Sequence, residues 1–184
     1  MAPRMPEKIR DYAVLKRIGK GGMGEVFLAD HPLLERHVAV KRFVFASGKG
    51  DDEVAARQRF LREGRALARL THHNIVQVHD LFDVRKQTCM VLEYVDGFDL
   101  AQLLQGGRLP VDVACIVALK VAEALEHAHY SGIVHRDVKA SNVMMSRRGD
   151  VKLMDFGIAK QDILEPMTQT GLVVGTPMYV APEV

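Results

Sequence analysis

A glycine-rich loop near the start of the 184-residue chain sets the strongest limit on its fold. Gly19, Gly21 and Gly24 have the spacing G-x-G-x-x-G, which occurs in loops whose backbone amides bind phosphate groups. In a dinucleotide-binding fold the last glycine opens a helix, but here an apolar, strand-like run follows at residues 26–29. The pattern therefore predicts a hairpin loop between two strands that closes over phosphates. For this motif alone, the alternative is a hairpin turn without a ligand.

The residues around this loop indicate a sheet with one helix. Residues 12–43 contain apolar, β-branched runs at 26–29 and 38–40, separated by glycine, proline and polar residues, which predicts antiparallel strands. Over residues 53–70 apolar side chains recur at helical spacing among many charges. This second pattern predicts one amphipathic helix.

The character of the chain changes at about Gly97. Two more strands are expected before it, at 75–78 and 89–95. Helices are expected after it, one from Leu100 and one over 110–130, where a proline stands at the favoured starting position. The predicted fold class is α+β, with a β-rich first part that holds one helix and a mainly helical second part.

Composition excludes several classes of protein. The 25 basic and 23 acidic residues leave a net charge of +2, which gives no electrostatic case for nucleic acid or an anionic membrane. Cys89 and Cys115 lie far apart and without metal-ligand spacing, so both are predicted to be buried free thiols in a reducing compartment. No apolar stretch approaches the roughly 18 residues that would suggest a membrane span. We therefore expect a cytoplasmic protein.

One lysine and one glutamate are predicted to point toward apolar surroundings. Period-two alternation places Lys41 on the same strand face as Ala39 and Phe43. On the predicted helix Glu63 lies three residues after Phe60, on the apolar stripe rather than the charged face. A buried charge without a partner is costly, so we expect the two to pair. For each residue alone, the alternative is an exposed side chain.

The second half contains two short apolar runs joined by a polar turn, which predicts a hairpin. Asn142 directly precedes this hairpin and Asp155 directly follows it, so the two should converge as oxygen ligands suited to magnesium. Asp137, just upstream, would accept the proton of an incoming hydroxyl or orient it. Lys139 would neutralise charge on a transferred phosphoryl group.

Taken together, these segments resemble Hanks-type serine/threonine protein kinases of bacterial type, from Tyr12 to the last residue. The resemblance rests on motifs in the family's order: the three glycines, residues 38–41, Glu63, residues 135–142, residues 155–157 and residues 181–183. It implies a kinase domain over 12–184, with an N-lobe and hinge at 12–95 and an incomplete C-lobe at 96–184. Residues 1–11 form an extension.

The resemblance also implies ATP and Mg²⁺ as cofactors and a protein with serine or threonine acceptors as substrate. The implied catalytic residues are Asp137, Lys139, Lys41 and Glu63, and the implied metal ligands are Asn142 and Asp155. The implied nucleotide contacts are Ile18, Gly19, Lys20, Gly21, Gly22, Met23, Gly24, Val26, Ala39, Lys41, Glu93, Val95 and Met144.

Arg136, directly before Asp137, is typical of kinases whose activation loop is ordered by phosphorylation. Thr168 and Thr170 are the predicted acceptors, through autophosphorylation that could involve self-association. The alternative is that both are unmodified loop residues.

The chain stops at Val184, just after the last family motif, whereas the family's domain continues. One hypothesis is therefore an active protein kinase in which a longer protein or a partner supplies the remaining helices of the domain. The competing hypothesis is an inactive nucleotide-binding or regulatory module. The histidines at 72, 73, 79, 127 and 129 show no partner at ligand spacing and are interpreted as structural.

Overall fold

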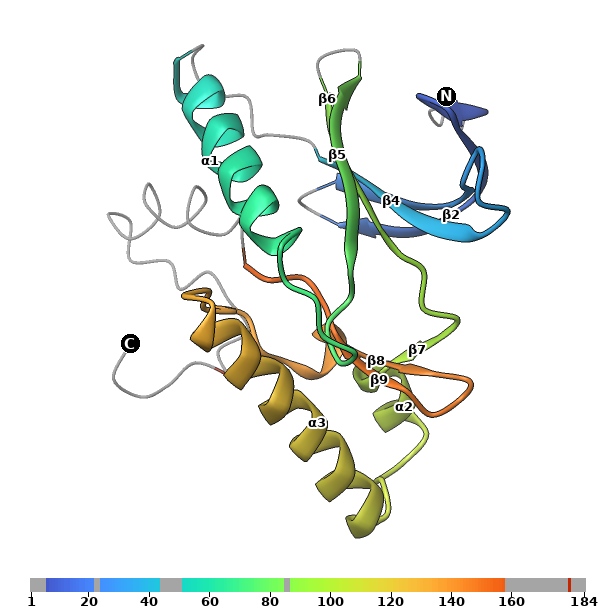
Figure 1. The fold of residues 1–184 in the computed structure, drawn as a ribbon. Coiled ribbons are helices and arrows are strands. Elements are labelled where there is room, and N and C mark those ends of the chain that lie inside the picture. The colour runs from blue at the N-terminus through green and yellow to red at the C-terminus, as the bar shows by residue number, and fades with distance from the viewer. Residues whose placement is uncertain (1–5, 22–23, 44–50, 85–86, 158–178, 180–184) are drawn as a thin grey trace. The chain divides into compact units, whose positions relative to one another are not determined.

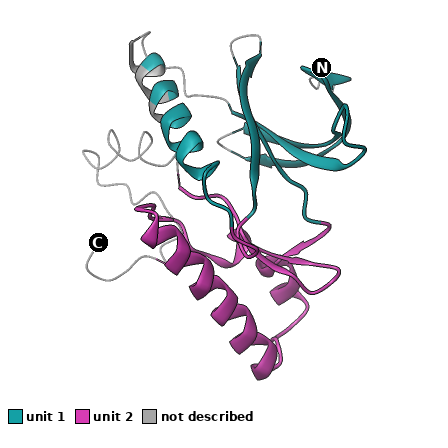
Figure 2. Cartoon of the chain, viewed as in Figure 1, with its two compact units in different colours: residues 1–71, 76–95 teal, residues 72–75, 96–184 magenta. Residues whose placement is uncertain are grey.

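The computed structural model describes residues 6–21, 24–43, 51–84, 87–157 and 179. The chain divides into two compact units (Figure 2). The first holds residues 1–71 and 76–95, and the second holds residues 72–75 and 96–184. Several predicted residues lie outside the described part: Gly22, Met23, Thr168, Thr170 and residues 181–183.

The first unit is an antiparallel sheet of six strands with one helix (Figure 1). The strand order is β1-β2-β3-β4-β6-β5. The strands are β1 (Lys8–Ile9), β2 (Tyr12–Gly21), β3 (Gly24–Asp30), β4 (His37–Phe43), β5 (Val78–Val84) and β6 (Gln87–Glu93). The helix, α1 (Asp51–Leu67), lies between β4 and β5 in sequence.

The two faces of this sheet bury different apolar groups. One face carries a core cluster of Ile9, Tyr12, Phe27, Ala29, Val38, Val40, Phe82, Cys89 and Val91. On the other face, the ring centroid of Phe43 on β4 lies 4.1 Å from that of Phe60 on α1. A Cβ atom at Gly64 would come within 3.0 Å of a Leu81 methyl group, so α1 packs close to β5. Burial in the core cluster raises the pKa of the Cys89 thiol to about 11.

The predicted helix and most of the predicted strands are present, but the strand expected at 75–78 is wrong. In the structure β5 begins only at Val78, and Ile75 instead forms an isolated parallel bridge with Leu153 of the second unit. A register shift between Val78 and Asp80 interrupts the alternation that would have revealed β5.

In its described residues, the second unit combines a small sheet with two helices. The sheet has the order β7-β8-β9, built from β7 (Gly97–Asp99), β8 (Val143–Ser146) and β9 (Val151–Leu153). The helices are α2 (Leu100–Gln105) and α3 (Val111–Tyr130), and a 3-10 turn, η1, spans Ala140–Asn142. Asp99 caps α2 by accepting a 2.8 Å bond from the Gln102 amide. As predicted, Pro110 directly precedes α3.

Two features of this unit differ from the sequence-based expectations. Gly97, at the expected change in the character of the chain, begins a strand that was not predicted. Its backbone approaches β8 so closely that a Cβ atom would lie 1.9 Å from the Met145 carbonyl oxygen. Cys115 is exposed on α3 rather than buried, since only Val117, Ala124 and Ala128 of that helix are buried. Among the described residues, no helix is long and apolar enough to cross a membrane.

Candidate functional site

The glycine-rich segment forms the predicted hairpin between β2 and β3, whose last described pair is Gly21 with Gly24. Gly24 has a φ of 136°, and a Cβ atom there would lie 1.9 Å from the Arg42 carbonyl oxygen on β4. Only glycine fits this close approach. On β2 a register shift between Arg17 and Gly19 leaves Ile18 unmatched and 43% exposed. The β2 arm is therefore irregular just before Gly19, whereas residues 19–21 pair in regular register with β3.

Lys41 occupies the strand face that the alternation predicted. It lies opposite Val26 in the register of β3 and β4, two residues from the buried Ala39. Its Nζ atom lies 5.4 Å from the ring centroid of Phe43, which packs on α1. Glu63 of α1 is, like Lys41, half-buried. The ion pair between Lys41 and Glu63 stays a prediction.

The residues implied in adenine binding lie on different elements. Ala39 is the register partner of Leu92, at the end of β6. Glu93 closes that strand, where its backbone amide donates to the Gln77 carbonyl at 2.8 Å. Val95, further along the chain, is half-buried. In the second unit, Met144 pairs with Asp99 and Lys152 at the centre of the small sheet.

The carboxylate of Asp137 is held between an ammonium and an amide group. Lys139 Nζ lies 3.1 Å from Asp137 Oδ2. Asn142 Nδ2 donates to the same oxygen at 3.0 Å and to the Asp137 carbonyl at 2.7 Å. The side chains of Asp137 and Lys139 are only 15% and 23% exposed, so their attraction is weakly screened. The sequence predicted separate roles for these three residues, and the structure brings their side chains together.

His135 fixes the backbone on both sides of this group. Its Nδ1 accepts a 3.2 Å bond from the Asp137 amide, and its Nε2 lies 3.0 Å from the Met154 carbonyl oxygen. These contacts require a neutral ring with the proton on Nε2. Burial lowers the pKa of His135, although the Met154 bond and nearby carboxylates oppose that effect. The ring also packs 4.4 Å from that of Phe156.

The hairpin of β8 and β9 brings Asn142 and Asp155 near each other at the backbone level. Val143 pairs with Leu153, and the Met154 amide donates to the Asn142 carbonyl at 2.9 Å. Since both bonds to Asp137 are made by Nδ2, the Oδ1 of Asn142 faces away from that carboxylate. Asp155 follows directly and has a left-handed φ of 56°. Non-glycine residues in that conformation gather at functional sites.

Comparisons with known proteins show the family to which the chain belongs. A family model described as the protein kinase domain matches residues 12–184. The chain belongs to the protein kinase family. Over 94% of its length it is 45% identical to the serine/threonine-protein kinase PksC of Streptomyces coelicolor. Over the same share it is 40% identical to the probable serine/threonine-protein kinase PknB of Lactococcus lactis.

The solved structure of the PknI kinase domain of Mycobacterium tuberculosis is also similar, with a TM-score of 0.71 and 36% identity. That match covers 91% of this chain and 68% of the other. Rad53 in complex with AMP-PNP matches with a TM-score of 0.75 and 27% identity, over 95% of this chain and 42% of the other. The chain spans about a third or less of the length of its curated relatives, 32% of PksC and 27% of that PknB.

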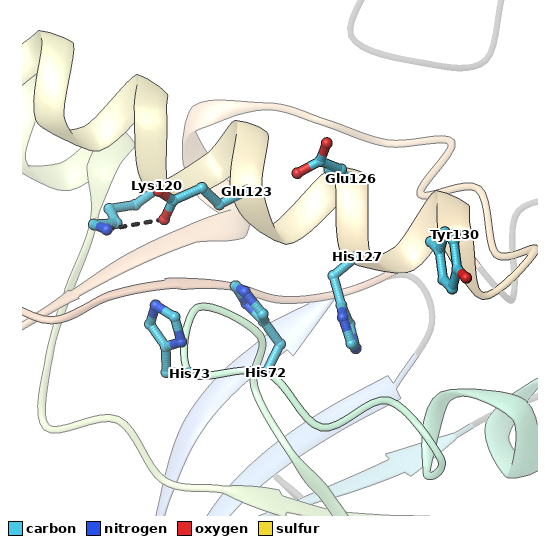
Figure 3. Close-up of a pocket in the computed structure, with 7 residues that line it drawn as sticks. All are labelled: His72, His73, Lys120, Glu123, Glu126, His127 and Tyr130. Carbon is cyan, nitrogen blue, oxygen red and sulfur yellow. Dashed lines mark hydrogen bonds and ion pairs between the residues drawn. The ribbon is translucent and has the colours of Figure 1, made fainter.

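This protein kinase chain also gathers three histidines that spacing along the sequence did not reveal. In Figure 3 the rings of His73, His72 and His127 lie side by side, with centroids 4.4 Å and 5.0 Å apart. They line a hollow of about 500 Å³ with Lys120, Glu123, Glu126 and Tyr130. Burial and the neighbouring imidazoles lower the pKa of His72. In the described part of the chain, no group of three or more histidine, cysteine, aspartate or glutamate side chains is arranged to hold a metal ion.

Proposed function

We propose that this chain provides the nucleotide-binding and phosphoryl-transfer residues of a serine/threonine protein kinase. The observation that carries the proposal is the held carboxylate of Asp137, bonded by both Lys139 and Asn142. A carboxylate fixed beside an ammonium suits a reaction in which a hydroxyl attacks a phosphoryl group. The kinase family supplies the reaction class, and the named relatives supply the serine/threonine preference.

In the proposed reaction a serine or threonine oxygen of a protein substrate bonds to the γ-phosphorus of ATP. The bond from that phosphorus to the bridging oxygen breaks, and ADP leaves. Asp137 orients the attacking hydroxyl and receives its proton. Lys139 balances negative charge on the transferred group. His135 supports Asp137 by accepting its backbone amide bond.

Asn142 and Asp155 fit a magnesium ion, because an amide oxygen and a carboxylate are hard oxygen ligands. Magnesium that carries a nucleotide keeps several waters and phosphate oxygens, so two protein ligands suffice. Bound there, the ion would neutralise phosphate charge. On the first unit, Lys41 supported by Glu63 would bind the α- and β-phosphates, beneath the glycine hairpin.

The adenine would contact Val26, Ala39 and Met144, with Glu93 and Val95 as hinge. One structural relative is described in complex with AMP-PNP. We further propose autophosphorylation at Thr168 or Thr170, on an activation loop paired with Arg136. A cytoplasmic setting, where ATP and magnesium are abundant, suits this reaction.

The decisive experiment replaces Asp137 by Asn in the protein that carries this chain. With magnesium and labelled ATP, kcat for transfer to a protein substrate should fall roughly 10²–10⁴-fold. The matched control is Asp112→Asn, since Asp112 is an exposed acid in the first turn of α3. Unchanged transfer in the Asp137→Asn protein would refute the mechanism. Nucleotide binding by the unmodified protein without any transfer would favour a regulatory module.

A further inference from the structure

We propose that Glu25 and Arg42 are positioning residues for the glycine hairpin. Their ion pair, supported by Arg17, holds the base of the hairpin against β4 and so sets its place over the phosphates of ATP. This inference rests on the proposed function, because it concerns how the hairpin meets the nucleotide. Neither residue belongs to the glycine pattern or to the implied catalytic set.

The three side chains connect three adjacent strands. Glu25 on β3 lies directly opposite Arg42 on β4 in the strand register. Its Oε2 accepts a hydrogen bond from the guanidinium of Arg42, and its Oε1 accepts one from Arg17 on β2 at 2.9 Å. Each carboxylate oxygen therefore binds a different arginine on a different neighbouring strand.

This group lies on the sheet face opposite to Lys41. Register pairs alternate in facing, and Glu25 with Arg42 comes directly before Val26 with Lys41. Glu25 shares its face with the buried Phe27, and the guanidinium carbon of Arg42 lies 5.1 Å from that ring's centroid. A nucleotide held by Lys41 lies on the other face. The ion pair therefore acts on ATP through the backbone of the hairpin.

Such support matters because the arm of the hairpin on β2 is irregular just before the glycine pattern. The register shift between Arg17 and Gly19 interrupts the ladder on β2. Glycine in general has no side chain to pack and has many accessible backbone conformations. Gly24, which touches the Arg42 carbonyl, directly precedes Glu25. The ion pair thus binds β3 to β4 one residue after Gly24, where β3 begins.

Arg42 and Arg17 should hold Glu25, and with it the hairpin, with unequal strength. The side chains of Glu25 and Arg42 are 17% and 22% exposed, whereas that of Arg17 is 46% exposed. Water screens an exposed pair more strongly, so the bond to Arg42 should hold the hairpin more firmly. The pKa of Glu25 is lowered mainly by its bond to Arg42, with burial opposing the effect and Arg17 adding to it.

The test compares steady-state kinetics of four single variants in the protein that carries this chain. Glu25→Gln and Arg42→Met should raise KM for ATP about five- to tenfold, while KM for the protein substrate changes less than about twofold. Arg17→Gln should raise KM for ATP less than about threefold, since its pair is exposed. Glu35→Gln, an exposed acid between β3 and β4, is the matched control and should change neither constant.

A charge exchange separates positioning from simple loss of stability. The double variant Glu25→Arg with Arg42→Glu should recover at least half of the lost ATP affinity, because the pair is restored in reverse. An unchanged KM for ATP in Glu25→Gln would overturn the inference. The inference would also be overturned if KM for ATP and KM for the protein substrate rose equally, thermal stability fell, and the charge exchange restored none of them. That result marks a merely structural role. If the unmodified protein binds no ATP, the proposed function itself fails.

Discussion

The Nζ of Lys139 and the Nδ2 of Asn142 converge on one oxygen of Asp137, at 3.1 Å and 3.0 Å. The two donors belong to residues two and five positions further along the chain. They also fix the side chain, because neither donor allows it to rotate away freely. The proposed roles of Lys139 and Asn142 can be separated by substituting each residue alone.

Replacement of Lys139 by Met should lower kcat about 10²-fold while KM for ATP changes little, because the ammonium acts on charge that develops during transfer. Steady-state kinetics at saturating magnesium measure both constants. Lys120→Met on α3 is the control, since that lysine pairs with Glu123. An equal fall in kcat for both variants would contradict a specific role of Lys139.

Replacement of Asn142 by Ala should raise the magnesium concentration needed for half-maximal transfer about 10-fold or more, because one oxygen ligand is lost. The backbone bond from the Met154 amide to residue 142 remains possible in this variant. A magnesium titration at fixed ATP measures the shift. If only kcat falls and the magnesium midpoint stays in place, Asn142 acts through Asp137 and not through the metal.

The neutral form of His135 should make stability depend on pH. Burial lowers the pKa of His135 in the folded chain, so the unfolded chain binds the proton more readily. The stabilising contribution is therefore complete above the unfolded pKa of about 6.5 and is lost as pH falls below it. His72 acts in the same direction, because its folded pKa is also lowered.

Urea unfolding at several pH values from 8 to 5 measures this effect. His135→Phe should be less stable at pH 8, since the bonds to Asp137 and Met154 are lost, but its stability should fall less on acidification. His129→Gln is the control, because His129 is exposed on α3. An equal pH dependence in wild type and His135→Phe would show that His135 is not the titrating group.

Because Gly24 approaches β4 closely, its replacement by alanine should destabilise the chain far more than the same replacement at Gly21. Gly24→Ala should lower the free energy of unfolding by about 2–4 kcal/mol, from its positive φ and the contact with the Arg42 carbonyl. Gly21→Ala should cost less than about 1 kcal/mol, since no atom of the described residues beyond its chain neighbours lies within 4 Å of its Cβ position. Urea unfolding of both variants decides whether the difference exists.

Local patterns in the sequence predicted the elements that keep a regular period. The alternation around Lys41 and the hairpin flanked by Asn142 and Asp155 are present because strand pairing follows directly from such periods. The patterns failed where contacts between distant segments decide the structure. The histidine stack joins His72 and His127 from separate elements, and no spacing rule along one segment can reveal it.

A contact between distant segments also explains why the strand predicted at 75–78 is absent. Asn74 Nδ2 donates to the Val151 carbonyl at 2.7 Å, and the Asn74 carbonyl accepts from the Leu153 amide at 2.8 Å. These bonds attach the turn at 72–75 to β9, two residues before Asp155. Ile75 is therefore buried beside Leu153, a residue far along the chain, and no pattern in the neighbouring sequence predicts that contact.

Asn74→Ala should consequently lower the free energy of unfolding by about 1–3 kcal/mol, because the buried Val151 carbonyl loses its side-chain donor. Asn74→Asp should be at least as damaging, since a carboxylate cannot donate and Asn74 is only 5% exposed. The control is Gln102→Ala, which removes an exposed cap contact on α2 instead. Hydrogen exchange at the Leu153 amide locates the effect, and it should quicken in both Asn74 variants but not in the control. Unchanged exchange at Leu153 with equal loss of global stability would show that Asn74 does not hold β9.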